Sequence, residues 1–344
     1  MPARDHLIGS LDGPLSLRWQ PRRALIDLAC IALALALVAI ALRSGRLGGD
    51  GADPFALLRS DAPSRLQTIV LHWRLPRALF ALVFGAALGM SGALFQSLIR
   101  NPLGSPDLVG FNSGAHTGAL VVITLLHGGH GAIALGAIVG GLGAAALVWL
   151  LSAGRGLQGL RLILIGVGVS ALLGAVNLWL SLRADLDTAM GAALWGAGSL
   201  NGMSWAKGLP AAAIAVAALC IGCALARRLR LLELGDASAG TLGVPVRATR
   251  NALLALGVIL SAAATAACGP IAFVALAAPA IARRLGGGLH RSAVVGALLL
   301  LGADLLAQHA FAPHQLPVGL VTSCLGGVYL VVLLLRRPAP LAPT

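Results

Sequence analysis

The chain has 344 residues, of which 58% are hydrophobic and only 11% are charged, and its mean hydropathy is +0.90. A soluble domain carries about 25% charged residues, so this composition excludes a soluble globular protein and indicates a polytopic membrane protein. The formal net charge of +13 accompanies long apolar runs. We therefore interpret the charge as a signal of membrane topology and expect no nucleic-acid partner.

Residues 1–23 form a polar tail before the first apolar run, which is not followed by a cleavage site, so we predict a retained first helix. We expect a transmembrane domain over residues 24–337, a C-terminal tail over 338–344, and an all-α fold with about ten transmembrane helices. The eighth segment is too short to span a bilayer alone. The apolar segments are 24–42, 75–98, 107–126, 131–152, 160–182, 206–226, 250–268, 271–282, 292–310 and 317–335.

An even number of spans places both termini on one side of the membrane. With the termini inside, 17 of the 25 basic residues fall in the inside segments and 8 fall in the outside loops. The excess of basic residues on cytoplasmic loops therefore predicts that both termini are cytoplasmic.

A hairpin over residues 74–118 is the most distinctive stretch. Arg74 and Arg77 bracket Leu75-Pro76, an uncharged run long enough to cross a bilayer follows, and the turn 101–107 breaks it after Arg100. The two arginines are exceptions to the charge rule, because they lie at the outside mouth of the second helix.

Two loops are longer than a plain connection requires. The outside loop, 183–205, contains an Ala-rich stretch at 188–194 that predicts a small helix on the periplasmic surface. The inside loop, 227–250, predicts one or two short amphipathic helices that stop at Pro245. A solvated loop is the alternative for each, but four leucines of the inside loop need a covering partner surface: Leu231, Leu232, Leu234 and Leu242.

The sequence offers little material for chemistry. The single lysine, Lys207, is not part of a phosphate-binding loop, and the histidines are scattered. Cys220 and Cys223 have CxxC spacing, but they lie inside a predicted membrane helix without a second pair. We therefore expect no catalytic residue, no metal site and no cofactor.

Asp304 is an acidic residue within the ninth apolar segment. An intramembrane carboxylate suggests a proton relay or an ion site, while a structural hydrogen-bonding role is the alternative. Because one carboxylate alone does not make a proton path, we favour the structural role.

Six segments in colinear order, over residues 70–335, resemble permease subunits of ABC importers for iron–siderophore complexes, haem and cobalamin. They are 74–118, 162–177, 194–207, 231–246, 268–283 and 316–330. Within this family, the segments 101–115 and 194–207 are most similar to ferric-enterobactin permeases, which pair with a different second permease. The resemblance implies a type II ABC importer permease fold in the inner membrane.

The resemblance also implies partners: a second homologous permease in a heterodimer, a cytoplasmic ABC ATPase dimer, a periplasmic binding protein and a ferric siderophore. It implies that Arg74 and Arg77 dock the binding protein and that the loop 227–250 couples to the ATPase. The matching coupling positions are Glu233, Gly235, Asp236, Leu242 and Gly243. The small helix near 188–194 matches a gating element, and the residues that follow are candidates to line the pathway: Trp195, Ser199 and Asn201.

Two positions depart from the family pattern. Ala280 stands where members often have histidine, and Gln308 stands where some carry a third docking arginine. We expect a permease subunit that moves a ferric catecholate siderophore while a separate subunit hydrolyses ATP. Two alternatives remain open at this point: a haem or cobalamin permease of the same family, and a proton-coupled secondary transporter that uses Asp304.

Overall fold

The computed structural model describes residues 6–8, 17–19, 21–43, 65–152, 159–311 and 314–335. The predicted tail 338–344 and most of the predicted tail 1–23 lie outside these residues. The elements in chain order are β1 (His6–Ile8), β2 (Leu17–Trp19), α1 (Pro21–Arg43), α3 (Arg65–Ile69), the π-helical turn η1 (Val70–Arg74), α4 (Leu75–Ile99), the 3-10 turn η2 (Pro106–Val109), α5 (Phe111–Thr124), α6 (His130–Ser152), α7 (Gly159–Arg183), α8 (Leu186–Gly196), α9 (Trp205–Glu233), α10 (Asp236–Thr241), α11 (Val246–Cys268), α12 (Val274–Arg284), α13 (Leu289–His309) and α14 (Val318–Leu335).

The prediction of an all-helical polytopic membrane fold is confirmed. Each of the ten predicted apolar segments contains one helix: α1, α4, α5, α6, α7, α9, α11, α12, α13 and α14. Within the described residues, seven helical stretches are long and apolar enough to cross a membrane. The eighth segment forms α12, which has only 11 residues. The antiparallel pair β1–β2, in which His6 lies opposite Trp19, was not predicted.

Two helical stretches extend furthest beyond the predicted segments. The α3, η1 and α4 elements follow one another without a break from Arg65 to Ile99, with Pro76 in the first turn of α4 where its missing N–H is tolerated. The α9 helix continues to Glu233, so only residues 234–245 of the predicted loop 227–250 lie outside long helices. Charged residues end a membrane span but not a helix, because arginine is a good helix former.

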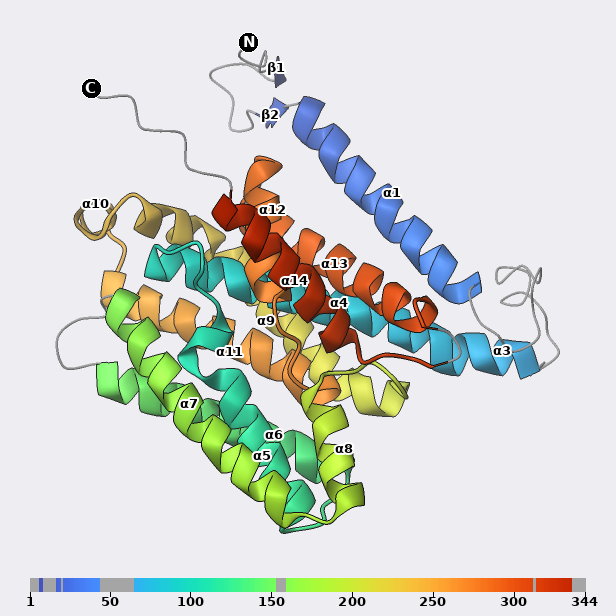
Figure 1. Ribbon diagram of the computed structural model, residues 1–344. Helices are drawn as coiled ribbons and strands as arrows, with labels where there is room; N and C mark the ends of the chain where they lie inside the picture. The colour runs from blue at the N-terminus through green and yellow to red at the C-terminus, as the bar shows by residue number, and fades with distance from the viewer. Residues whose placement is uncertain are drawn as a thin grey trace.

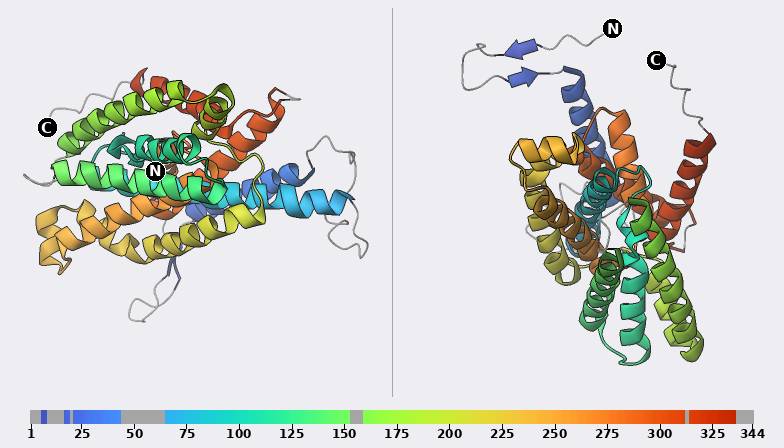
Figure 2. Two further views of the ribbon diagram at one scale, coloured as in Figure 1. Left: turned by 90° about the horizontal axis from the view of Figure 1, so that it is seen from below. Right: turned by 90° about the vertical axis from the view of Figure 1, so that its left-hand side faces the viewer.

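The α4 helix lies at the centre of the bundle (Figure 1). It packs against α13, α11, α12 and α9, and 72% of its apolar span is buried, compared with 11% for α1 and 17% for α7. Phe84, Met90, Leu94 and Phe95 of α4 are among the largest fully buried side chains. The α5, α6 and α7 helices form a neighbouring group, with α8 close to one end of it (Figures 1 and 2).

The long helices give the molecule two ends, here named the α10 end and the α8 end after the short helix at each. Arg291, in the first turn of α13, pairs with Asp27 near the start of α1 at 2.9 Å. The α14 helix starts at the α8 end, where the Gly319 N–H donates to the Gly198 carbonyl at 3.0 Å. It runs back toward the α10 end, where Tyr329 and the end of α12 line one cavity. The helical domain therefore begins and finishes at the α10 end.

Glycines bring two helix pairs into backbone contact. A Cβ atom added to Gly89 of α4 would overlap the Ser292 carbonyl oxygen of α13, and one added to Gly118 of α5 would overlap the Gly136 carbonyl oxygen of α6. Small residues four apart allow such close packing in membranes, where dispersion and backbone contacts replace the hydrophobic effect. The glycines at the two contacts are Gly85, Gly89 and Gly296, and Gly114, Gly118, Gly136 and Gly140.

The contact between α5 and α6 can be tested with two glycines of α6. In Gly140→Ala the new methyl group would overlap the Gly114 carbonyl oxygen, whereas nothing lies within 4 Å of the position it would take in Gly143→Ala. We expect Gly140→Ala to lower the free energy of unfolding by about 1–3 kcal/mol, the usual cost of overpacking. Gly143→Ala should leave it unchanged or raise it, because alanine is the better helix former. Thermal unfolding of the full chain in detergent measures both, and equal midpoints would contradict the role of this contact.

Candidate functional site

A buried ion pair lies at the α8 end, where it joins α4 to α13. The Arg77 guanidinium donates from Nε to Asp304 Oδ2 at 2.8 Å and from Nη2 to Oδ1 at 2.9 Å. The two side chains are 13% and 2% exposed. Two parallel hydrogen bonds from a planar guanidinium to both oxygens of a carboxylate form the strongest geometry for such a pair. The structure therefore joins two residues that the sequence presented as separate candidates, one for docking and one for an intramembrane role.

Two glutamines complete the hydrogen bonds of this pair. Gln308, one turn after Asp304 on α13, donates to Asp304 Oδ2 at 2.8 Å. Gln315, in the segment before α14, accepts from Arg77 Nη1 at 3.1 Å. Asp304 thus has a cationic partner and a further hydrogen bond, and such partners offset the cost of burying a carboxylate. This geometry favours the structural role of Asp304 over a proton relay.

Arg74 is less constrained than Arg77. Its Nη1 donates to the carbonyl oxygen of Leu42 near the end of α1 at 2.8 Å, and no described carboxylate pairs with it. The turn η1, which ends at Arg74, is held to the start of α9 because the indole N–H of Trp205 donates to the Leu71 carbonyl oxygen at 2.9 Å. Within the part of the chain that the structure describes, the positive charge of Arg74 at the mouth of the helix therefore has no acidic partner.

A cavity of about 340 Å³ lies beside the ion pair. The three residues proposed from the sequence to line a pathway, Trp195, Ser199 and Asn201, all line this one cavity. Gln315 also lines it, so the cavity and the Arg77–Asp304 pair share one side chain. The remaining lining residues are His130, Leu194, Gly202, Met203, Lys207, Ala267, Cys268 and Pro317.

The cavity wall is positively charged and partly aromatic. Lys207 supplies the positive charge, His130 supplies an imidazole that can form a hydrogen bond, Trp195 supplies an indole face, and no acidic side chain occurs among the lining residues that the structure describes. The Ser199 backbone N–H donates to the Cys268 carbonyl oxygen at 2.7 Å, and this bond holds the loop that carries Ser199 in place. Such a wall can hold an anionic group by charge and a flat apolar group by contact with the indole.

The predicted small helix of the loop 183–205 is α8. Asp185 caps it by accepting a hydrogen bond from the Thr188 N–H at 3.2 Å, the contact that free N–H groups at a helix start require. A hydrogen bond with the Thr188 side chain and the bond from the Thr188 backbone N–H hold the pKa of the Asp185 carboxyl below its usual range. The C-terminal part of α8 then carries Trp195 to the cavity.

At the α10 end, two acidic candidates contact the end of α4. Ser97 Oγ donates to Glu233 Oε1 at 2.7 Å. Asp236, the first residue of α10, accepts from Arg250 at 2.7 Å and from Arg100 at 3.2 Å. These pairs are largely exposed and contribute little stability. They do, however, connect α10 directly to α4, which shares the highest burial of the apolar spans with α11.

The other coupling candidates set the shape and surface of the segment 234–245. Gly235 and Gly243 flank α10 with φ of +113° and +78°, backbone conformations that side chains rarely adopt. Leu242 and its neighbour Leu234 are 59% and 65% exposed, while Leu232 is buried in the bundle. Two of the four leucines that needed a partner surface therefore remain uncovered beside α10.

Several residues of these sites were missed by the reasoning from sequence. His130, Lys207 and Gln315 at the cavity, and Ser97, Arg100 and Arg250 at the α10 end, carried no motif or periodic signal that linked them to the candidates. Their partners lie far along the chain, for example 238 residues between Arg77 and Gln315. Among the described residues, no cluster of three or more potential metal ligands occurs.

Comparison with known proteins identifies the family. The FecCD transport family matches residues 31–336, which is most of the chain. The chain belongs to the FecCD transport family. The ferric enterobactin transport system permease protein FepG of Escherichia coli is 52% identical over 321 residues, covering 92% of this chain and 97% of FepG. The hemin transport system permease protein HmuU of Yersinia pestis is 38% identical, covering 89% of this chain and 94% of HmuU.

The fold of this FecCD chain is also that of a solved ABC transporter of metal-chelate type in an inward-facing conformation. The two share 30% identity with a TM-score of 0.80, over 91% of this chain and all of the other. A more distant likeness, to PsaBC of Streptococcus pneumoniae, has a TM-score of 0.56 and 19% identity, over 79% of this chain and 95% of that one, and concerns the fold alone. The chain is thus an ABC importer permease, and the prediction that it is a transport subunit rather than an enzyme is confirmed.

The Arg77–Asp304 pair can be tested with a double-mutant cycle. We expect Arg77→Gln and Asp304→Asn each to lower the free energy of unfolding by about 3–5 kcal/mol, because each leaves a buried charge unpaired. The double variant should lose much less than the sum of the two. Asp27→Asn, which breaks the more exposed pair with Arg291, serves as the control and should cost about 1 kcal/mol or less. Additive losses in the cycle would show that the two side chains do not interact.

Proposed function

We propose that this chain is a permease subunit that imports a ferric siderophore of the catecholate type across the inner membrane of a bacterium. The observation that carries the proposal is the 52% identity to the ferric enterobactin permease FepG, which extends over 92% of the chain. The FecCD family match over residues 31–336 includes the cavity residues, the two arginines at the mouth of α4 and the segment around α10.

The chemistry of the cavity at the α8 end supports this cargo. A ferric tricatecholate is a polyanion, because the six phenolate oxygens outweigh the charge of the iron, and its three rings are flat and aromatic. Lys207 offers positive charge, His130 offers a hydrogen bond, and Trp195 offers an aromatic face. These groups match an anionic aromatic chelate by charge and by ring contact.

We further propose that the α10 end faces the cytoplasm. The helix α1 begins and the helix α14 finishes at this side of the molecule. The basic residues of α9, α11, α12 and α13 also gather there. The bias of basic residues toward cytoplasmic segments supports this orientation, with both termini inside. The α8 end, with its cavity and its two arginines, then faces the periplasm.

This orientation assigns a partner to each end. A binding protein that delivers the cargo meets Arg74 and Arg77, whose guanidinium groups suit carboxylates on its surface. The ATPase meets α10 with the exposed Leu234 and Leu242. A second permease, different from this chain, covers part of the apolar surface of α7 and α14, where Leu172, Val328 and other large side chains are exposed.

Uptake by the reconstituted importer tests the function. Proteoliposomes with this chain, its second permease, the ATPase and the binding protein should take up a ferric tricatecholate only when ATP is supplied. Haem and cobalamin should be transported far more slowly. Leu242→Asp places a charge on the uncovered surface beside α10 and should abolish uptake without lowering the unfolding midpoint of the chain. Uptake driven by a proton gradient without ATP, or preference for haem or cobalamin, would contradict the proposal.

Docking of the binding protein can be assigned by comparing three arginines of the α8 end. Arg74→Glu should weaken docking by about 10- to 100-fold at low salt, because it removes a charge-assisted contact and adds repulsion. Arg77→Glu also breaks the pair with Asp304, so its effect on docking is read only after the unfolding midpoint is measured.

Arg183→Glu is the matched control for docking, since Arg183 stacks over Trp179 at the same end but away from the mouth of α4. It changes the net charge by the same amount as Arg74→Glu. Titration of the binding protein onto the membrane complex at several salt concentrations measures all three variants. Equal losses for Arg74→Glu and Arg183→Glu would indicate general attraction and would contradict a docking site at Arg74.

A further inference from the structure

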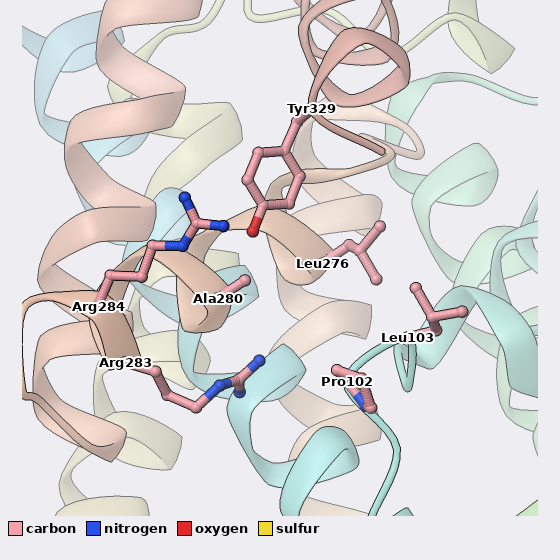
Figure 3. Close-up of a pocket in the computed structure, with 7 residues that line it drawn as sticks. All are labelled: Pro102, Leu103, Leu276, Ala280, Arg283, Arg284 and Tyr329. Carbon is pink, nitrogen blue, oxygen red and sulfur yellow. The ribbon is translucent and has the colours of Figure 1, made fainter. Parts of the chain in front are cut away.

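A second cavity, of about 300 Å³, lies at the α10 end and shares no lining residue with the cavity beside Asp304 (Figure 3). It is formed where the turn after α4, the end of α12 and the end of α14 meet. No residue of the coupling segment lines it. The lining residues are Pro102, Leu103, Leu276, Ala280, Arg283, Arg284 and Tyr329.

The cavity carries positive charge that no described acidic group neutralises. Arg283 and Arg284 are the last two residues of α12, and neither pairs with a carboxylate among the residues that the structure describes. Arg283 donates from Nη1 to Gln96 Oε1 at 2.6 Å, which fixes its side chain and leaves further N–H donors. Arg284 has no hydrogen-bond partner within the described part of the chain. An uncompensated pair of guanidinium groups attracts an anion.

A tyrosine supplies an independent sign of a ligand. Tyr329 is the single tyrosine of the chain, and its hydroxyl oxygen is buried without a hydrogen-bond partner among the described residues. Buried polar atoms in folded proteins nearly always have a partner, so an exception calls for an explanation. In Figure 3 the Tyr329 hydroxyl points toward the side of the cavity where the Arg284 guanidinium lies. An anionic oxygen between them would accept from both groups.

The other walls are apolar and limit the size of the ligand. Leu276, Leu103, Pro102 and Ala280 line the rest of the cavity. Ala280 is small, and a larger side chain at this position would fill part of the space. Ligand pockets start at about 300 Å³, so this one accommodates a single ring or headgroup and not a whole chelate.

We propose that this cavity binds an anionic, oxygen-bearing group of the size of one catecholate ring or one phosphodiester. The inference deepens the proposed function, because the catecholate source rests on that cargo. Two sources provide this chemistry: one arm of the ferric tricatecholate as it leaves the pathway, and the headgroup of an anionic phospholipid in the cytoplasmic leaflet. In both cases Arg284 and Tyr329 donate to the anionic oxygen, and the apolar wall contacts the carbon atoms beside it.

The test compares Arg284→Gln and Tyr329→Phe with the wild type in the complete importer. Arg161→Gln is the matched control, because Arg161 lies at the start of α7, outside the cavity, and donates only a long bond of 3.4 Å to the Leu151 carbonyl oxygen. Each importer is reconstituted in phosphatidylcholine alone and in phosphatidylcholine with phosphatidylglycerol. Two quantities are measured: ATP-driven uptake of a ferric tricatecholate, and the unfolding midpoint of the complex in each membrane.

If the cavity holds an arm of the cargo, Arg284→Gln and Tyr329→Phe should lower uptake by about tenfold in both membranes, the loss expected for one hydrogen bond to a charged group. If it holds a lipid headgroup, phosphatidylglycerol should raise the unfolding midpoint of the wild type and of Arg161→Gln but not that of the two cavity variants. Either result supports the site and identifies its ligand.

The proposal is overturned if both cavity variants behave as Arg161→Gln does in uptake and in the response to phosphatidylglycerol. Failure of the proposed function gives a different result, because the wild type itself would not take up the ferric tricatecholate. The lipid response of the unfolding midpoint requires no transport and still tests the cavity in that case. The conservative Tyr329→Phe variant keeps the ring, so a fall in its uptake with an unchanged unfolding midpoint reports on the hydroxyl.

Discussion

Glycines let α4 and α13 approach to backbone contact, and this contact determines where the charged groups of the α8 end lie. A Cβ atom at Gly85, Gly89 or Gly296 would overlap the facing backbone, so larger residues would force the helices apart. At the same helix pair, Arg77 of α4 reaches both oxygens of Asp304. The ion pair is therefore a consequence of the packing, and it also fixes the register of the two helices.

A buried pair of this kind contributes less to stability than its short distances suggest. Removing a guanidinium and a carboxylate from water costs several kcal/mol, which the attraction between them roughly offsets. The greater effect is on specificity, because any shift of α13 along α4 would leave a charge unpaired in a medium that solvates it poorly. The pair also helps to fix the position of one cavity wall, since Gln315 contacts Arg77 and lines the cavity.

Much of the fold could be predicted from the sequence, because a bilayer requires long apolar helices and charged residues show where they leave it. The helix ends were harder to predict. Arg227, Arg228 and Arg230 ended the predicted sixth span, yet α9 continues through them to Glu233. The membrane limits where charge can lie and does not limit where a helix can continue.

Some site residues could be predicted from the sequence and others could not. Trp195, Ser199 and Asn201 follow one another closely, so a resemblance over one short segment was enough to bring all three to the cavity. The partner of Asp304 could not be found from the sequence, because Arg77 lies 227 residues away and neither residue has a pattern that depends on the other. Tyr329 and the arginines of α12 are likewise brought together only by tertiary packing.

The shared position of Gln315 also links the energies of the two features that it joins. It accepts a hydrogen bond from Arg77 and forms part of the cavity wall, so these two roles compete for the same amide orientation. If a partner that alters the hydrogen bonds of Arg77 also alters the affinity of the cavity through this amide, thermodynamic reciprocity requires that a molecule in the cavity alter the affinity for that partner by the same factor. Under the proposed function, this amide would connect docking of the binding protein at Arg77 with binding of the cargo in the cavity.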